Sequence, residues 1–178
     1  MSKKEYRTNW RQGVTSPFES NWSKVHKFAF LNRVDATQIK SSLSSADWQD
    51  KSLYWGSKAG QLLFPGHLDI QRLSSVFQED ESVLNDGWLE PYRFLNDQWE
   101  DYASYLRFCP ICIRSGYHSP LYQMLWLSQR PIHHVALVQS CPNCHAEIPL
   151  TLTKREFRPY YGCHCGAHLW PGLNDKAA

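Results

Sequence analysis

The sequence predicts a mainly α-helical protein with a small β component, in which a helix-turn-helix-like domain precedes a zinc-ribbon-type zinc-finger domain. Two observations support this prediction. Apolar residues recur at three- and four-residue spacing in the first half of the chain, and all six cysteines lie in the second half. We place the helical domain at residues 1–105 and the zinc-binding domain at residues 106–178.

Composition is that of a folded protein without a membrane span. The 178 residues are 42% hydrophobic and 14% aromatic, which is enough to build one or two small cores. No segment approaches the roughly 18 consecutive apolar residues of a membrane span, and the N-terminal residues lack the apolar stretch of a secretory signal. We therefore expect a cytoplasmic protein with no membrane partner, whose reduced cysteines bind metal rather than form disulfides.

The net charge of +2 is unevenly distributed. Lys and Arg exceed Asp and Glu by eight to three in residues 1–40 and by seven to three in residues 106–178, whereas acids exceed bases by eleven to four between them. This pattern suits a protein that touches an anionic polymer and also a basic partner surface. Solvated faces that merely differ in sign would produce the same distribution.

The first helical unit lies within residues 19–43. Ser20 can cap a helix whose apolar residues recur at helical spacing, with Ser23 and Lys24 on the side expected to face solvent. Asn32-Arg33 indicates a turn, and a shorter helix follows from Ala36 to Leu43. Helix, tight turn and short helix form the outline of a helix-turn-helix. Its candidate DNA contacts are Lys24, Lys27 and Arg33, together with Lys40.

A second unit repeats this outline. Asp69 can cap a helix over residues 70–77, residues 78–80 indicate a turn, and another short helix begins at Glu81 and closes before Gly87. The acidic residues around this turn argue against contact with phosphate. Ordinary packed helical hairpins share the outline of both units, so the shape alone does not establish DNA binding.

Cysteine spacing predicts a four-thiolate zinc site near the C-terminus. Cys141 and Cys144 are separated by two residues, a gap that lets two thiolates from one turn bind an ion at about 2.3 Å. Cys163-His164-Cys165 follows, which completes the pattern C-x2-C-x18-C-x-C of a zinc ribbon. β-branched and aromatic residues predict its two strands within residues 147–153 and 157–161.

The other pair, Cys109 and Cys112, predicts a less complete zinc site. His133 can supply a third ligand, whereas Arg130, at the position where a matching ligand pair would begin, is permanently cationic and cannot. The candidates for the fourth ligand are His118 and His134.

Ser119-Pro120 favours the start of a helix over residues 121–128, which would bury Leu121, Met124, Leu125 and Trp126. His118 and His133 would lie at its two ends. A surface polar residue beside a helix cap is the alternative interpretation of His118.

The order of these motifs resembles the zinc region of TniQ proteins, the target-selection factors of AAA+-dependent transposons. An N-terminal segment over residues 17–43 also resembles the entry helix of that family, and the two segments occur in the family's order. The matching runs in the zinc region are Phe108-Cys-Pro-Ile-Cys112, Gly116-Tyr-His-Ser119, Gln123-Met-Leu-Trp126, Pro131-Ile-His-His134, Ser140-Cys-Pro-Asn-Cys144 and Cys163-His-Cys165-Gly166.

The resemblance implies a bacterial, nucleoid-associated adaptor without chemistry of its own. It would bind an AAA+ transposition ATPase and DNA, and the short length is similar to members that work with a CRISPR effector complex. Family members usually have C-P-x-H where this chain has Arg130-Pro-Ile-His133. This departure leaves one complete zinc site and removes a ligand from the other.

Basic residues interleaved with aromatics follow the second cysteine pair, at Lys154, Arg155 and Arg158. They are candidates for contact with phosphate or an acidic partner, and a solvated hairpin is the alternative. Two rival functions are a stand-alone helix-turn-helix and zinc-ribbon DNA-binding regulator, and a hydrolase using an open zinc. No glutamate motif accompanies the ligands, which argues against the hydrolase and against an enzyme.

Overall fold

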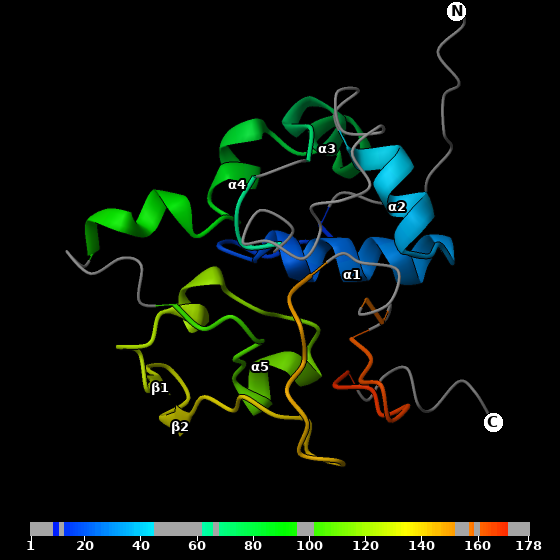
Figure 1. Cartoon of the computed structure of the whole chain (residues 1–178). Coiled ribbons are helices and arrows are strands. Elements are labelled where there is room, and N and C mark those ends of the chain that lie inside the picture. The colour runs from blue at the N-terminus through cyan, green and yellow to red at the C-terminus, as the bar shows by residue number, and fades with distance from the viewer. Residues whose placement is uncertain are drawn as a thin grey trace, which may run out of the picture.

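The computed structural model describes residues 9–10, 13–44, 62–65, 68–95, 102–151, 157–158 and 161–170. Within them the chain is mainly helical, with one small antiparallel sheet (Figure 1). The helices are α1 (Asn21–Asn32), α2 (Ala36–Leu43), α3 (Ile70–Phe77), α4 (Glu81–Asn85) and α5 (Pro110–Arg114), with 3-10 helices at Glu90–Leu95 and Pro120–Gln123; the strands are β1 (Gln129–Arg130) and β2 (Val135–Ala136).

Helix α1 begins and ends where the sequence predicts. The Ser20 hydroxyl accepts a hydrogen bond from the Ser23 amide at 3.1 Å, which satisfies one of the free donors of the first turn. Arg33 adopts a left-handed conformation with φ of 52°, so the chain turns out of the helix and its amide bonds back to the last carbonyls.

The prediction that one side of α1 faces solvent is wrong. Every residue from Asn21 to Ala29 is buried, and Lys24 has 0% exposure. Figure 1 shows the reason: α1 lies between the helices α2, α3 and α4 on one side and the cysteine-rich half of the chain on the other. A helix covered on two sides cannot keep a broad polar face in water.

Helices α2, α3 and α4 lie where the sequence predicts them. Asp35 and Gln38 form a reciprocal capping box at the start of α2, and the Asp69 carboxylate accepts hydrogen bonds from the first amides of α3. Because Ile39 and Leu43 point into the core, α2 keeps polar residues on its other face. The α3 helix packs against both α2 and α4.

One hydrophobic cluster contains residues from both halves of the chain. From the helical half it includes Trp22, Leu73 and Phe77, and from the cysteine-rich half Phe108 and Tyr161. Because α1 contributes side chains to both sides, it links the helices to the cysteine-rich region.

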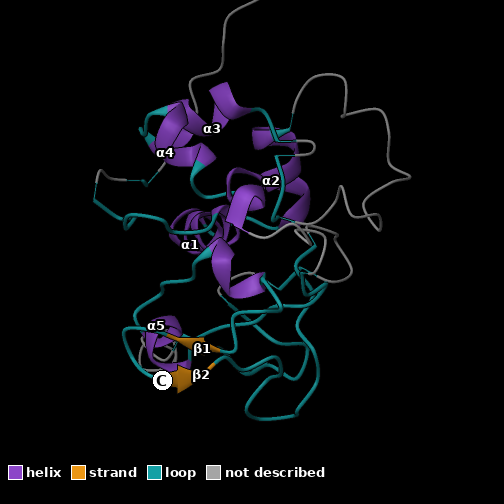
Figure 2. Ribbon diagram, turned by 90° about the vertical axis from the view of Figure 1, so that its left-hand side faces the viewer, coloured by secondary structure: helices purple, strands orange, loops and turns teal. Residues whose placement is uncertain are grey.

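The cysteine-rich half is built mainly from loops (Figure 2). The helix predicted over residues 121–128 is only the 3-10 turn Pro120–Gln123, and it leaves Leu125 and Trp126 about half exposed. The predicted ribbon strand starting at residue 147 is reduced to isolated bridges at Glu147 and Pro149. Proline lacks an amide hydrogen, so it interrupts a ladder at that point.

Parts of the predicted hairpin, including residues 152–156 with Lys154 and Arg155, lie outside the described residues. Among the residues that are described, no helix has the length and apolar character needed to cross a membrane.

Candidate metal centres

The four C-terminal cysteines converge as the sequence predicts. The sulfurs of Cys141, Cys144, Cys163 and Cys165 all lie within 4.8 Å of one another. Two of the separations, Cys141 to Cys165 and Cys144 to Cys163, are 3.8 and 3.6 Å. A tetrahedral ion with bonds of 2.3 Å places its sulfur ligands about 3.8 Å apart, whereas a disulfide requires about 2.05 Å. The cluster is therefore consistent with a zinc site and not with two disulfides.

Tight turns present these sulfurs. The Cys141 amide donates to the Ala146 carbonyl at 2.9 Å, and His145 completes the turn with φ of 61°. On the other side, the Cys163 amide donates to the Ala167 carbonyl at 2.8 Å, and Gly166 occupies a left-handed position with φ of 87°.

The local hydrogen bonds favour a thiolate at Cys165. The Asn143 side-chain amide donates to the Cys165 sulfur at 3.5 Å. Together with the backbone hydrogen bond from Ala167, this contact lowers the pKa of the Cys165 thiol to about 6. A metal ion binds the thiolate form, so these hydrogen bonds favour the ligand form of Cys165, whereas burial raises the pKa of the neighbouring ligand Cys163 to about 12.

The second group combines Cys109, Cys112 and His133, whose ligand atoms also lie within 4.8 Å of one another. The His133 Nδ1 atom is 3.3 Å from the Cys109 sulfur and 3.4 Å from the Cys112 sulfur. Cys109 caps α5 and Cys112 lies within it, while His133 is in the turn between β1 and β2. Figure 2 shows α5 beside these two strands. The Tyr122 hydroxyl is 3.3 Å from the Cys112 sulfur and can donate to its thiolate.

His118 does not join this group, so its prediction as a ligand is wrong, and it is not a surface residue either. The imidazole is fully buried, and both ring nitrogens have partners. The Ser20 hydroxyl, 2.6 Å away, donates to Nδ1, and Nε2 donates to the Arg107 carbonyl at 3.0 Å. Because Ser20 also caps α1, His118 supports the start of that helix. His134, the other candidate, is exposed and lies outside the ligand group.

We expect both buried histidines, His26 and His118, to stay neutral in the folded protein at mildly acidic pH. Burial lowers the pKa of each to about 3 from the ordinary 6.5. Below pH 6.5 the unfolded chain therefore binds more protons than the folded chain, so stability falls as pH decreases toward 3, by about 1.4 kcal/mol per pH unit for each histidine at most.

Imidazole NMR signals test this prediction directly. Both rings should keep their neutral-form shifts between about pH 7 and pH 5, while the urea midpoint decreases over the same range. The variant His118→Gln should show a shallower dependence of the midpoint on pH. Protonation of the His118 ring in the folded protein near pH 6 would contradict the assignment.

Of the basic residues predicted to contact DNA on or beside α1, two are buried and one is exposed. Lys24 forms an ion pair with Glu79 at 3.2 Å, and Lys27 forms one with Glu19 at 2.8 Å, so neither buried ammonium group is available to phosphate. The sequence predicts Lys24 on the side of the helix that faces solvent, and that placement is wrong because the two halves of the protein cover α1. Lys27, the other candidate DNA contact on this helix, is buried as well. Arg33 is exposed at the end of this helix.

Sequence reasoning missed the buried polar network that includes the Lys27 pair. The Ser23 hydroxyl donates to Glu19 at 2.5 Å and lies 2.7 Å from the Tyr161 hydroxyl. Ser23 follows Glu19 by one helical turn, and this local spacing was the only available signal. The contact between Ser23 and Tyr161 joins residues 138 positions apart in the chain, and no sequence pattern predicts it.

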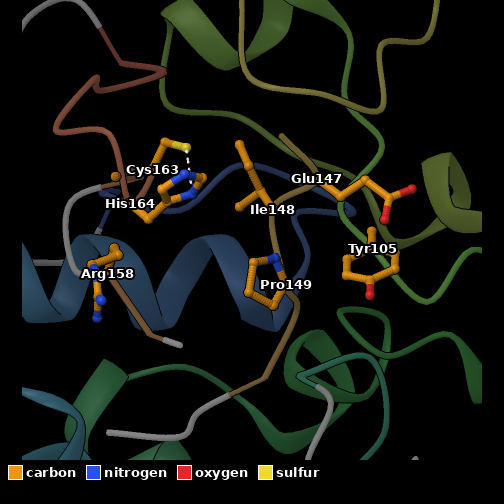
Figure 3. A pocket seen from close by; sticks show the side chains of 8 residues that line it. Tyr105, Glu147, Ile148, Pro149, Arg158, Cys163 and His164 are labelled. Atoms are coloured by element: carbon orange, nitrogen blue, oxygen red, sulfur yellow. Dashed lines mark hydrogen bonds between the residues drawn. The ribbon is translucent and has the colours of Figure 1, made fainter. Parts of the chain in front are cut away.

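Arg158 is exposed on the wall of a pocket of about 270 Å³ beside the four-cysteine cluster. Figure 3 shows Arg158 and His164 on one side of this pocket, Ile148 and Pro149 in the middle, and Glu147 with Tyr105 on the other side. Cys163 also lines it, so this predicted basic residue lies near a ligand of the C-terminal site. The pocket carries charges of both signs and does not indicate a particular small molecule.

Fold and site together define a class: a small helical protein joined to a cysteine-rich module that has one four-cysteine cluster and one group of two cysteines and a histidine. No protein-family model matches the chain, and no curated protein is significantly similar to it.

Proposed function

We propose that the protein is a TniQ-like target-selection adaptor that binds DNA and an AAA+ transposition ATPase, with zinc at its cysteine clusters. One observation supports the proposal most strongly: the two segments that carry the resemblance, far apart in sequence, pack against each other. The Ser20 amide donates to the His118 carbonyl at 2.7 Å, and the Tyr161 hydroxyl donates to the Ser23 carbonyl at 3.2 Å. The entry helix and the zinc region thus act as one scaffold.

The metal centres favour a docking role over catalysis. A four-thiolate zinc is fully coordinated by protein and leaves no position for substrate, which is the arrangement of structural zinc sites. Such a site contributes folding free energy to a region of loops that has few regular hydrogen bonds of its own. The result is a rigid surface made of short turns.

The exposed charges suggest separate faces for DNA and for protein. Arg33 is exposed at the end of α1, three positions before α2 begins, and Thr37, Gln38 and Ser41 are exposed on α2. Hydroxyl and amide groups on a short helix next to a cation suit contact with a DNA backbone. In the same half of the chain, Asp80 and Glu81 are exposed at the start of α4, which suits a basic surface of a protein partner.

We expect the double variant Arg33→Glu/Arg158→Glu to weaken DNA binding without loss of fold. If each arginine neutralises one phosphate, the slope of log affinity against log salt should become shallower by about 2. Salt-dependent fluorescence anisotropy measures this slope, and thermal melting checks the fold. Arg114→Glu is a matched control because Arg114 is exposed at the C-terminal end of α5, away from α2. Unchanged affinity and slope in the double variant would exclude these two residues as the DNA contacts.

Copurification tests the adaptor role. A tagged full-length protein should retain an AAA+ ATPase encoded beside it, and its DNA binding should increase when that ATPase is present. Sequence-specific DNA binding that the ATPase does not affect would favour a stand-alone regulator instead.

A further inference from the structure

We propose that the metal bound by Cys109, Cys112 and His133 takes a carboxylate from outside the chain as its fourth ligand, and that Arg130 holds this carboxylate. The inference rests on the metal-binding part of the proposed function and adds a ligand chemistry to it. Its test needs neither DNA nor the ATPase.

The described residues supply three ligands, one short of a tetrahedral zinc. Two polar side chains near the ligands have other roles. His118 uses both ring nitrogens in hydrogen bonds to Ser20 and Arg107, and the Tyr122 hydroxyl lies against the Cys112 sulfur. In a closed structural site the chain itself would fill the fourth position, and none of the residues that the structure describes does so.

Arg130 stands where a ligand pair would begin, because Arg130 and His133 repeat the two-residue gap between Cys109 and Cys112. The guanidinium carbon lies 5.5 Å from the centre of the Tyr122 ring, and that same tyrosine contacts Cys112 through its hydroxyl. The arginine is thus anchored beside the metal ligands by a cation–π contact.

The Arg130 Nε atom is buried and has no hydrogen-bond acceptor among the described residues. A buried donor on a charged group without an acceptor is costly, and buried polar groups are nearly always satisfied in folded proteins. A carboxylate at this position would accept from the guanidinium with one oxygen and bind the metal with the other. The contact between the guanidinium and this one oxygen is a charge-assisted hydrogen bond, which is stronger than a hydrogen bond between neutral groups.

The charge balance points the same way. Two thiolates neutralise a divalent metal and a neutral histidine adds nothing, so the site with Arg130 carries one positive charge. An anionic fourth ligand restores neutrality, whereas a water molecule would leave the positive charge uncompensated. A cysteine at position 130 would instead give the site a net negative charge. The arginine gives it a net positive charge, so the site with arginine attracts an anion.

Two exposed apolar side chains flank the ligands. Ile111 lies between the two cysteines and is 46% exposed, and Ile132 precedes the histidine and is 70% exposed. A carboxylate can come from a free organic acid or from an acidic side chain of a partner protein. Two exposed isoleucines beside the ligands would add contact area only for a side chain with apolar neighbours.

The experiment uses the full chain loaded with Co²⁺, whose visible absorption reports the ligands of the metal. Subtracting the spectrum of the double variant Cys109→Ser/Cys112→Ser, which keeps the four-cysteine site, isolates the bands of the first site. The protein is then titrated with acetate, and separately with a blocked tripeptide that has aspartate between two leucines. Arg130→Gln removes the cation, and Arg130→Cys supplies a third thiolate.

We expect carboxylate to shift the first-site bands in the unmodified protein. Arg130→Gln should retain Co²⁺ but bind acetate about tenfold more weakly or worse, because it loses a charge-assisted hydrogen bond. Arg130→Cys should show stronger sulfur-to-cobalt absorption and no response to acetate. Tighter binding of the tripeptide than of acetate assigns the carboxylate to a protein side chain, and equal binding assigns it to a free acid.

Bands that do not respond to either carboxylate, or a response that Arg130→Gln leaves unchanged, would overturn the inference. Failure of Co²⁺ to bind at the first site would overturn it as well, together with the metal that the proposed function places there. The DNA and ATPase measurements are independent of these spectra, so the adaptor role can stand if only the carboxylate site fails.

Discussion

Cys141→Ser is expected to release the C-terminal metal ion and unfold the region around it. The substitution replaces a fully buried ligand whose sulfur lies 3.8 Å from that of Cys165. Structural zinc contributes on the order of 10 kcal/mol to the folding of small zinc modules, whereas whole domains are stable by only about 5–15 kcal/mol. The loss of one thiolate therefore removes a large part of the total stability.

The damage should extend to α1, more than a hundred positions away in the sequence. Tyr161 precedes the ligand Cys163 by two residues, and its ring packs edge-on against Trp22 at 5.3 Å. Its amide also donates to His26 at 3.1 Å. Loss of the metal should thus remove contacts from one side of α1, and its amides should exchange faster with solvent.

Metal analysis, thermal melting and hydrogen exchange together test this expectation. His145→Asn is the matched control: His145 is exposed, lies in the same turn outside the ligand set, and has a left-handed conformation that asparagine tolerates. The control should keep its metal and its melting temperature. A Cys141→Ser variant that melts like the unmodified protein and retains a full complement of metal would contradict the four-thiolate assignment.

Lys27→Met is expected to destabilise the protein by about 3–5 kcal/mol, because it leaves the charge of Glu19 buried without its partner. Glu19 has 0% exposure, and its carboxylate lies 2.8 Å from the Lys27 ammonium group. The ammonium also donates to the Val14 carbonyl at 2.9 Å. Among the described residues, the buried acidic and basic side chains apart from histidine are Glu19, Lys24, Lys27 and Arg107.

A double-mutant cycle separates the pair from simple packing loss. Adding Glu19→Gln to Lys27→Met should restore part of the stability, since a neutral amide is less costly to bury than an unpaired carboxylate. Arg33→Met, at the exposed end of the same helix, should change the free energy of unfolding by less than about 0.5 kcal/mol. Urea denaturation of five proteins measures these values: the unmodified protein, the single variants Lys27→Met and Glu19→Gln, their double variant, and Arg33→Met. Equal loss in Lys27→Met and Arg33→Met would mean that the buried pair contributes nothing.

The features that could be predicted from the sequence are those set by near neighbours. The caps at Ser20, Asp35 and Asp69 involve residues two or three positions along the chain, so the residue type at one position indicates the start of a helix. The two-residue gaps between cysteines act in the same way, because a tight turn of fixed length brings two sulfurs together.

Long-range packing decided the features that the sequence left open. The spacing of Lys24 and Lys27 is typical of an exposed helical face. Both lysines form buried ion pairs because the helices on one side and the cysteine-rich region on the other cover α1. The sequence makes His118 a candidate fourth metal ligand, yet a hydrogen bond to Ser20, 98 positions away, places it at the start of α1. Helix caps and metal turns are short-range interactions that a local pattern encodes. Burial depends instead on which distant segments meet, and no single stretch of sequence contains that information.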